Sequence, residues 1–166
     1  TTAALGSPHD LVDPGIGVKR FPACASTHQA LDATLALAEE HAIDPAAVVS
    51  VECGVNYMAP HQLIYDRAET GLQGKFSLEY AVAAAVVDAG VVLASFENAR
   101  VQRSDIQALL RRVAVGEASV PPSGQPAAPG CGARGFGRHG HVPAHIGVVP
   151  GGSGTVNAFS RNEISA

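Results

Sequence analysis

The sequence predicts a small α+β domain in which helices pack on a partial β-sheet, with an irregular C-terminal tail. Before residue 117, three segments repeat apolar residues at helical spacing, and one segment alternates apolar and polar residues as a strand does. The last 50 residues hold 10 of the 18 glycines and 6 of the 11 prolines, and they offer little to bury beyond a short apolar run at Ile146–Val149. We therefore expect a folded part, residues 1–116, and an irregular or poorly ordered tail, residues 117–166.

The first helix is predicted over residues 27–41, because Ser26 and Gln29 have the spacing of a capping box ahead of an apolar stripe. After a single turn, residues 49–55 alternate apolar and polar side chains, which is typical of a strand with one solvent-exposed face. Residues 58–74 show no periodicity and are expected to form a long loop, a kind of element that often carries function.

Two further helices are predicted after this loop. Ser77 can cap a helix that runs through Asp88 and is closed by Gly90. Its residues are apolar nearly all round, so we expect it to be the central buried helix. Ser104 and Gln107 form a second capping-box pattern, ahead of an apolar face that extends to residue 113.

Composition argues against several classes of function. Acidic residues outnumber lysine and arginine by 15 to 11, which gives no electrostatic footprint for nucleic acid. The apolar run at residues 82–87 is far shorter than the roughly 20 residues that cross a bilayer, and no charged-then-apolar leader begins the sequence. Three cysteines without CxxC spacing do not suggest a disulfide framework. We expect a cytoplasmic protein without a membrane span.

Lys19, Arg20 and His28 form the first candidate site, at the start of the first predicted helix. The unpaired N–H groups and partial positive charge of a helix start favour a bound carboxylate there. The alternative is that both cations are solvated and that His28 is a surface residue. Cys24, which lies between them, is a candidate nucleophile, although a small buried apolar role suits it better.

Lys75, Ser77 and Tyr80 form the second candidate site, at the start of the central helix. Lys75 precedes the cap and Tyr80 lies one turn inside, so both can reach the volume in front of the helix end. Alternatively, Ser77 only caps, Tyr80 packs in the core and Lys75 is solvated.

Two patterns in the tail do not support a cofactor site. Residues 135–140 match GxGxxG, but no strand precedes them and Pro143 prevents a following helix, so we reject a dinucleotide site. The tail also contains four residues of the types that bind zinc, namely Cys131, His139, His141 and His145. Their spacing matches no zinc finger, so no metal site is predicted.

Four blocks of sequence, in this order and spacing, resemble the C-terminal part of MmgE/PrpD proteins: KRFPACASTHQALDATLAL, AIDPAAVVSVEC, TGLQGKFSLEYAVAAAVVDAGVVLASF and RSDIQALLRRV. The resemblance covers about residues 15–113. This family includes 2-methylcitrate dehydratase, cis-aconitate decarboxylase and iminodisuccinate epimerase. It implies a small α+β lid that closes a site against a large helical domain. It also implies a reaction, without metal or organic cofactor, that removes a proton next to a carboxylate in small di- or tricarboxylic acids.

The resemblance also assigns roles to individual residues. Lys19 matches the lysine before the FP pair, which would bind a substrate carboxylate, His28 matches the histidine at the helix start, and Tyr80 matches the tyrosine of the FSxxY block that faces the cleft. His28 and Tyr80 are thus candidate catalytic residues. The candidate substrate-binding residues are Lys19, Arg20, Lys75 and Ser77. The family's helical domain is the implied partner, and a homodimer is the implied assembly.

The sequence departs from the family pattern in three ways. Cys24 stands where the decarboxylases carry a histidine, which argues against decarboxylation. The helical domain, with the family's aspartate and histidine acid/base candidates, is not among these residues. The tail lacks the family's pair of acidic, β-branched strands. Read one nucleotide forward, codons allowed for residues 135–142 can encode Asp-Ser-Asp-Gly-Thr-Val-Thr-Tyr, a hairpin with an Asp-Gly turn, so we hypothesise a frameshifted tail.

Two functions therefore remain open from the sequence. The chain is either the lid of a lyase or isomerase acting on small polycarboxylates, or a non-catalytic remnant without its catalytic partner domain.

Overall fold

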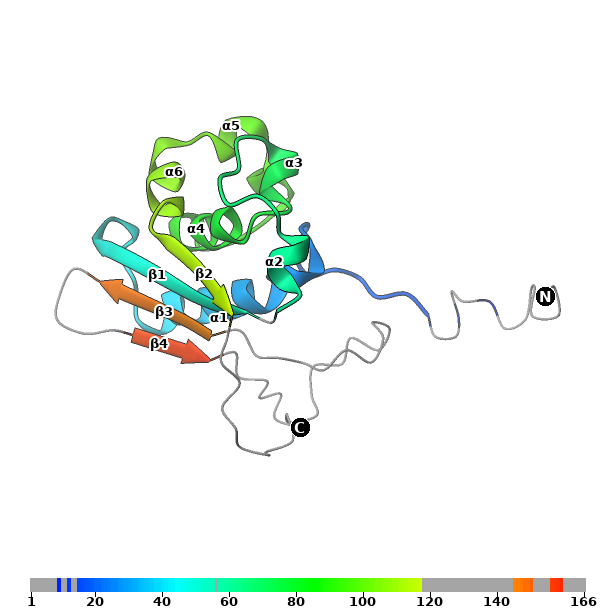
Figure 1. Ribbon diagram of the computed structural model, residues 1–166, viewed down its shortest axis with the longest axis horizontal. Helices are drawn as coiled ribbons and strands as arrows, with labels where there is room; N and C mark the ends of the chain where they lie inside the picture. The colour runs from blue at the N-terminus through cyan, green and yellow to red at the C-terminus, as the bar shows by residue number, and fades with distance from the viewer. Residues whose placement is uncertain are drawn as a thin grey trace, which may run out of the picture.

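A computed structural model describes residues 9, 12, 15–55, 57–117, 145–150 and 156–159, the last two ranges by their backbone (Figure 1). In chain order the elements are η2 (Ala25–Thr27), α1 (His28–Glu40), η3 (Pro45–Ala47), β1 (Val48–Val55), α2 (Ala59–Gln62), α3 (Gly71–Gly74), α4 (Leu78–Asp88), η4 (Leu93–Phe96), α5 (Asn98–Val101), α6 (Ser104–Leu110), β2 (Val113–Glu117), β3 (His145–Pro150) and β4 (Val156–Phe159). The predicted α+β class is confirmed.

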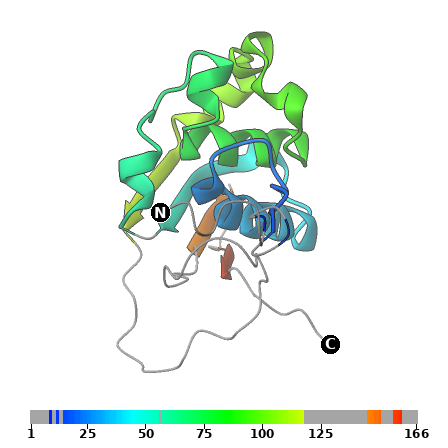
Figure 2. The same cartoon turned by 90° about the vertical axis from the view of Figure 1, so that its right-hand side faces the viewer.

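The strands form one mixed sheet in the order β2-β1-β3-β4. β2 runs parallel to β1, with Val113 opposite Val51, whereas β3 is antiparallel to β1 and β4 to β3. Along β1, Val51 and Cys53 are buried while Glu52 between them is exposed, as predicted for a strand with one solvent-exposed face. Helices α3 to α6 gather on one side of the molecule, and α1 packs against β3, β4 and α4 (Figures 1 and 2).

Helix α4 is the centre of the core, as its apolar sequence predicts. Residues 80–85 are completely buried, and α1, α6 and β2 all pack against this helix. The hydroxyl oxygen of Ser77 accepts a hydrogen bond from the backbone N–H of Tyr80 at 3.0 Å, which confirms the predicted cap. At the C-terminal end of α4, the residue with a left-handed backbone conformation is Ala89, whose φ is 51°. The sequence analysis predicted that Gly90 closes this helix.

Two predicted capping boxes do not form, because their side chains bind more distant groups. Ser26 donates to the side-chain oxygen of Gln62, which ties the start of α1 to α2. The amide of Gln107 donates to the carbonyl oxygens of Ala68 and Val101, at 2.9 and 2.8 Å. These bonds anchor residues 58–74, where two short helices, α2 and α3, lie within the expected loop.

The tail contributes two strands where the sequence predicted irregular chain. β3 contains the apolar run at Ile146–Val149, and it pairs with the edge of β1 that β2 leaves free. A strand edge with unpaired N–H and C=O groups favours such pairing, which the composition of the tail does not reveal. Residues 118–144 lie outside the described residues, and with them the GxGxxG match, Cys131, His139 and His141, and the segment of the frameshift hypothesis. In the part of the chain that the structure describes, no helix has the length and apolar character needed to cross a bilayer.

Candidate functional site

The segments that lead into α1 and α4 lie side by side. The backbone N–H of Cys24 donates a hydrogen bond to the carbonyl oxygen of Lys75 at 3.0 Å. The bond between Ser26 and Gln62 brings in α2, which follows the end of β1. Gln62 follows Val55, the last residue of β1, by seven positions, so the two helix starts lie towards the carboxyl end of β1. The carboxyl end of the parallel strand β2 lies at the same edge of the sheet, the edge at which ligands bind in many open α/β sheets. The structure therefore brings together the backbone segments that carry Lys19 and His28 on one side and Lys75 on the other.

Lys19 and Arg20 have different partners. The ammonium group of Lys19 donates to the carbonyl oxygen of Ala23 at 3.1 Å. The guanidinium of Arg20 forms an ion pair with Asp32 of α1, with 2.5 Å between Nη1 and Oδ1, and its Cζ lies 5.3 Å from the centroid of the Phe21 ring. Since a carboxylate already occupies Arg20, Lys19 is the cation that a ligand carboxylate can engage at lower cost.

His28 occupies the first position of α1, beside Lys19. Its ring packs edge to face on Phe21, with 5.4 Å between centroids, and its Nε2 is buried without a hydrogen-bond partner among the described residues. Burial lowers the pKa of His28 from its usual 6.5, and the nearby Lys19 charge lowers it further. The carbonyl groups of Ala23 and Phe21 and the carboxylate of Asp32 act in the opposite direction but do not overcome the burial. The imidazole is therefore neutral at pH 7 and able to accept a proton.

Lys75 and Ser77 serve the start of α4 in different ways. The carbonyl of Lys75 holds Cys24, and its ammonium nitrogen lies 5.9 Å from the centroid of the Phe96 ring. Ser77 is buried, and besides capping α4 its hydroxyl donates to the carboxylate of Glu79 at 3.5 Å. Lys75 remains a candidate for binding a ligand, whereas the hydroxyl of Ser77 is committed to the helix.

Tyr80 does not face an open cleft, contrary to the expectation from the sequence. Its side chain is completely buried, its hydroxyl donates to the carbonyl oxygen of Ser95, and its ring packs against Phe96 with 5.8 Å between centroids. Burial, followed by the charge of Asp88, raises the pKa of Tyr80 to about 12. The central helix is apolar nearly all round, so the phenol points into the core and satisfies its hydroxyl there.

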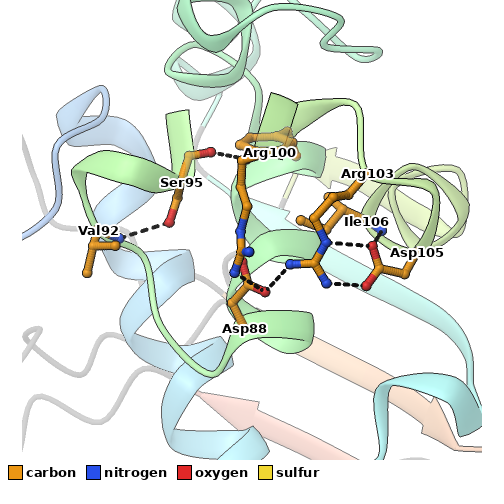
Figure 3. Close-up of polar contacts among 8 residues, drawn as sticks. Asp88, Val92, Ser95, Arg100, Arg103, Asp105 and Ile106 are labelled. Atoms are coloured by element: carbon orange, nitrogen blue, oxygen red, sulfur yellow. Dashed lines mark hydrogen bonds and ion pairs between the residues drawn. The ribbon is translucent and has the colours of Figure 1, made fainter. Parts of the chain in front are cut away.

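A hollow of about 570 Å³ lies elsewhere, around the C-terminal end of α4, and Figure 3 shows Asp88, Arg100 and Arg103 from its lining. Asp88 is only 10% exposed and accepts hydrogen bonds from Arg100 at 3.0 Å and from Arg103 at 2.9 Å. Arg103 also binds Asp105. Since a carboxylate faces each guanidinium, this cluster holds α4, α5 and α6 together and leaves no uncompensated cation for an anion. None of the sequence-predicted site residues lines this hollow.

The starts of α1 and α4, residues 23–28 and 75–77, are called the joined helix starts below. Glu79 is a titratable residue next to them in α4, and the sequence interpretation did not single it out. It lies in the first turn of α4, where an acidic residue is usually a partner of the helix dipole. In the structure it is half-buried, and burial, followed by the charge of Asp66, raises its pKa. Burial raises the pKa of the Cys53 thiol in β1 to about 12, and the nearby charge of Glu79 contributes to the rise.

The residue types that bind metals are scattered through the described part of the chain. Among them, no three His, Cys, Asp or Glu side chains come together as a metal site requires. The backbone of His145 lies in β3, next to Gly54 of β1.

Comparison with known proteins identifies the domain. The family model for the MmgE/PrpD C-terminal domain matches residues 21–166. A comparison with curated proteins gives no match. The matched range begins two residues after Lys19 and runs through the tail, so on the C-terminal side it extends beyond the four blocks of resemblance, which lie within residues 15–113. The chain thus belongs to the MmgE/PrpD family, and residues 21–166 are its C-terminal domain.

Proposed function

We propose that this domain supplies the carboxylate-binding lid of an enzyme that removes a proton next to a carboxylate in small di- or tricarboxylic acids. The reaction would be that of a lyase or isomerase similar to 2-methylcitrate dehydratase, without a metal or organic cofactor. The observation that carries the proposal is the hydrogen bond from Cys24 to Lys75, which brings the segments of Lys19, His28 and Lys75 together.

The chemistry accounts for these residue types. Removal of a proton next to a carboxylate adds negative charge to a group that is already charged, so fixed cations lower the barrier. Lys19 binds the carboxylate next to the reacting carbon, and Lys75 binds a second carboxylate. His28, a neutral imidazole, is the group that can take up the proton. Tyr80 acts at a distance from the substrate, by fixing the start of α4 against Ser95.

A partner must complete the site. The segment between β1 and α4, beside the joined helix starts, exposes four large apolar side chains: Tyr57, Ile64, Leu72 and Phe76. A covering partner would bury these side chains and exclude water from the substrate. The partner that fits the proposal is the helical domain of an MmgE/PrpD protein. The assembly would then be a homodimer of complete proteins in the cytoplasm.

Hydrogen exchange into substrate tests the proposal independently of the final product. The full chain is mixed with a separately expressed MmgE/PrpD helical domain and a panel of di- and tricarboxylic acids in D₂O, and deuterium incorporation next to the carboxylates is followed by NMR. We expect exchange in the mixture, reduced by about 10²–10⁴-fold in His28→Gln.

Arg111→Gln is the matched control. This substitution removes an exposed cation just before β2, at the opposite end of the sheet from the joined helix starts, and should leave the exchange unchanged. If the two domains associate and no acid exchanges, the proposal is wrong and the chain is better described as a non-catalytic remnant.

A further inference from the structure

We infer that Asp32 is a specificity-determining residue that fits the site to acids with two carboxylates. Asp32 neutralises Arg20 and so leaves Lys19 and Lys75 as the cations that a ligand can bind. This inference rests on the proposed function and names its substrate class, which is dicarboxylic rather than tricarboxylic acids.

The ion pair between Arg20 and Asp32 is harder to exchange than an exposed pair usually is. Nη1 of Arg20 lies 2.5 Å from Oδ1 of Asp32, and the two side chains are 70% and 40% exposed. Pairs with this exposure generally contribute little to stability. However, Oδ1 of Asp32 is itself buried and has no hydrogen-bond partner among the described residues, so the guanidinium is the group that compensates it. A ligand that took Arg20 would leave a buried, charged oxygen without a partner, which is costly.

This ion pair lies beside the histidine of the proposed site. Cζ of Arg20 is 5.3 Å from the centroid of the Phe21 ring, and the same ring packs edge to face on His28 with 5.4 Å between centroids. Asp32 follows His28 by four positions on α1, so both side chains lie on the same face of this helix. A carboxylate bound next to His28 would therefore meet Arg20 together with Asp32.

The two lysines have no such internal partner. The ammonium group of Lys19 donates to the carbonyl oxygen of Ala23 at 3.1 Å, and this acceptor is uncharged. The ammonium nitrogen of Lys75 lies 5.9 Å from the centroid of the Phe96 ring. Among the described residues, no carboxylate forms an ion pair with either lysine. Two cations without carboxylates match the two carboxylates of a dicarboxylic acid.

A third carboxylate on the ligand would find no third free cation. At Arg20 it would compete with Asp32, and the exchange of one carboxylate for another gains little. The displaced Asp32 would then lie beside the ligand with a charge of the same sign, which disfavours the exchange further.

The test compares two acids that differ by one carboxylate. They are glutarate and tricarballylate, which is glutarate with a third carboxylate on its central carbon. Calorimetric titration of the full chain measures both dissociation constants, at a pH at which every carboxyl group of the two acids is ionised. We expect the unchanged chain to bind the two acids within about threefold of each other.

Asp32→Asn should free Arg20 for the third carboxylate. We expect this variant to bind tricarballylate tighter relative to glutarate by about three- to tenfold, a range that allows for the exposure of the guanidinium. Arg20→Gln combined with Asp32→Asn removes the whole pair and should return the ratio of the two dissociation constants to that of the unchanged chain.

Glu39→Gln is the matched control. It removes the same charge from the same helix, at an exposed residue near the other end of α1, and should leave the ratio unchanged. Thermal unfolding followed by circular dichroism shows that each variant is folded.

The outcomes separate the inference from the proposed function. If the unchanged chain binds tricarballylate more than threefold tighter than glutarate, the inference is wrong and carboxylate binding stands. This comparison decides the matter even if Asp32→Asn does not fold. A folded Asp32→Asn protein with the same ratio as Glu39→Gln also overturns the inference. If the unchanged chain binds neither acid, the proposed function fails and the inference fails with it.

Discussion

The hydroxyl of Tyr80 donates its hydrogen bond to the carbonyl oxygen of Ser95, inside the core and away from solvent. A tyrosine that the family resemblance assigns to the active site is thus, in this chain, a link between α4 and η4. The link positions the helix start at which Lys75 lies, and it leads to the first prediction.

Tyr80→Phe should lower the free energy of unfolding by about 1–3 kcal/mol, because the buried carbonyl of Ser95 loses its donor. The affinity for tricarballylate, a tricarboxylic acid that serves as the probe ligand, should stay within about twofold of the affinity of the unchanged protein. The reason is that the phenol of Tyr80 does not touch the ligand. Urea unfolding and calorimetric titration measure the two quantities. Tyr57→Phe, at an exposed side chain, is the matched control and should change neither. A large loss of affinity without a loss of stability would place the phenol at the ligand after all.

Gly71 packs so closely on η4 that no side chain fits there. A Cβ at this position would lie 1.7 Å from the carbonyl oxygen of Phe96. Gly71→Ala should therefore displace α3 and cost about 1–3 kcal/mol or more, which thermal unfolding will show. At Gly17 a Cβ meets nothing within 4 Å, so Gly17→Ala should leave the stability within about 0.5 kcal/mol. Equal stability of the two variants would contradict this packing.

Glu79 should make the stability depend on pH in the acidic range. Its pKa in the folded protein is raised above the usual 4.5, so folding favours the protonated carboxyl. The stability that this preference contributes is full below pH 4.5 and is lost as the pH rises through the folded-state pKa.

Glu79→Gln should therefore be more stable than the unchanged chain at pH 7, and should show a weaker decline in stability from pH 4 upwards. Chemical unfolding at a series of pH values measures the difference. Glu52→Gln, at an exposed residue of β1, is the control and should follow the unchanged chain. A Glu79→Gln protein that is less stable at pH 7 than at pH 4 by the same margin as the unchanged chain would contradict the assignment.

Removal of residues 118–166 should destabilise the domain, because it leaves the second edge of β1 unpaired and uncovers part of α1. We expect a thermal midpoint lowered by more than about 5 °C, since 1 kcal/mol corresponds to about 4–8 °C in a domain of this size. Removal of residues 160–166 alone keeps β3 and β4 and should have little effect. A fragment of residues 1–117 that unfolds at the unchanged midpoint would contradict this expectation and support the division at residue 116 that the sequence predicts.

Local patterns in the sequence predicted the main elements of the fold. The apolar stripe of α1, the alternation of β1 and the Ser77 cap of α4 depend on neighbours within a few residues, so the sequence reveals them directly. β2 was not predicted, because Val113 continues the apolar face of α6 by spacing although it begins a strand. β3 and β4 were not predicted either, since their pairing depends on the free edge of β1, almost 100 residues earlier in the chain.

The candidate site shows the same limit. The sequence identified the cations at two helix starts, but the bond from Cys24 to Lys75 that joins these starts spans about 50 residues and has no local signal. The sequence also could not show that Arg20 is paired with Asp32, or that the hydroxyl of Tyr80 is directed towards Ser95. The enclosure of Asp88 by Arg100 and Arg103 likewise follows from the packing of α4, α5 and α6.

The most direct test of the account maps the binding of tricarballylate on the full chain by amide chemical shifts, in the unchanged protein and in Lys19→Gln. The account predicts that shifts centre on the joined helix starts, around residues 23–28 and 75–77, and that Lys19→Gln weakens the affinity by about tenfold, as expected when one charge-assisted contact is lost. Arg111→Gln should bind as the unchanged protein does. Shifts centred instead on Arg100 and Arg103, or an affinity that Lys19→Gln leaves unchanged, would contradict the account.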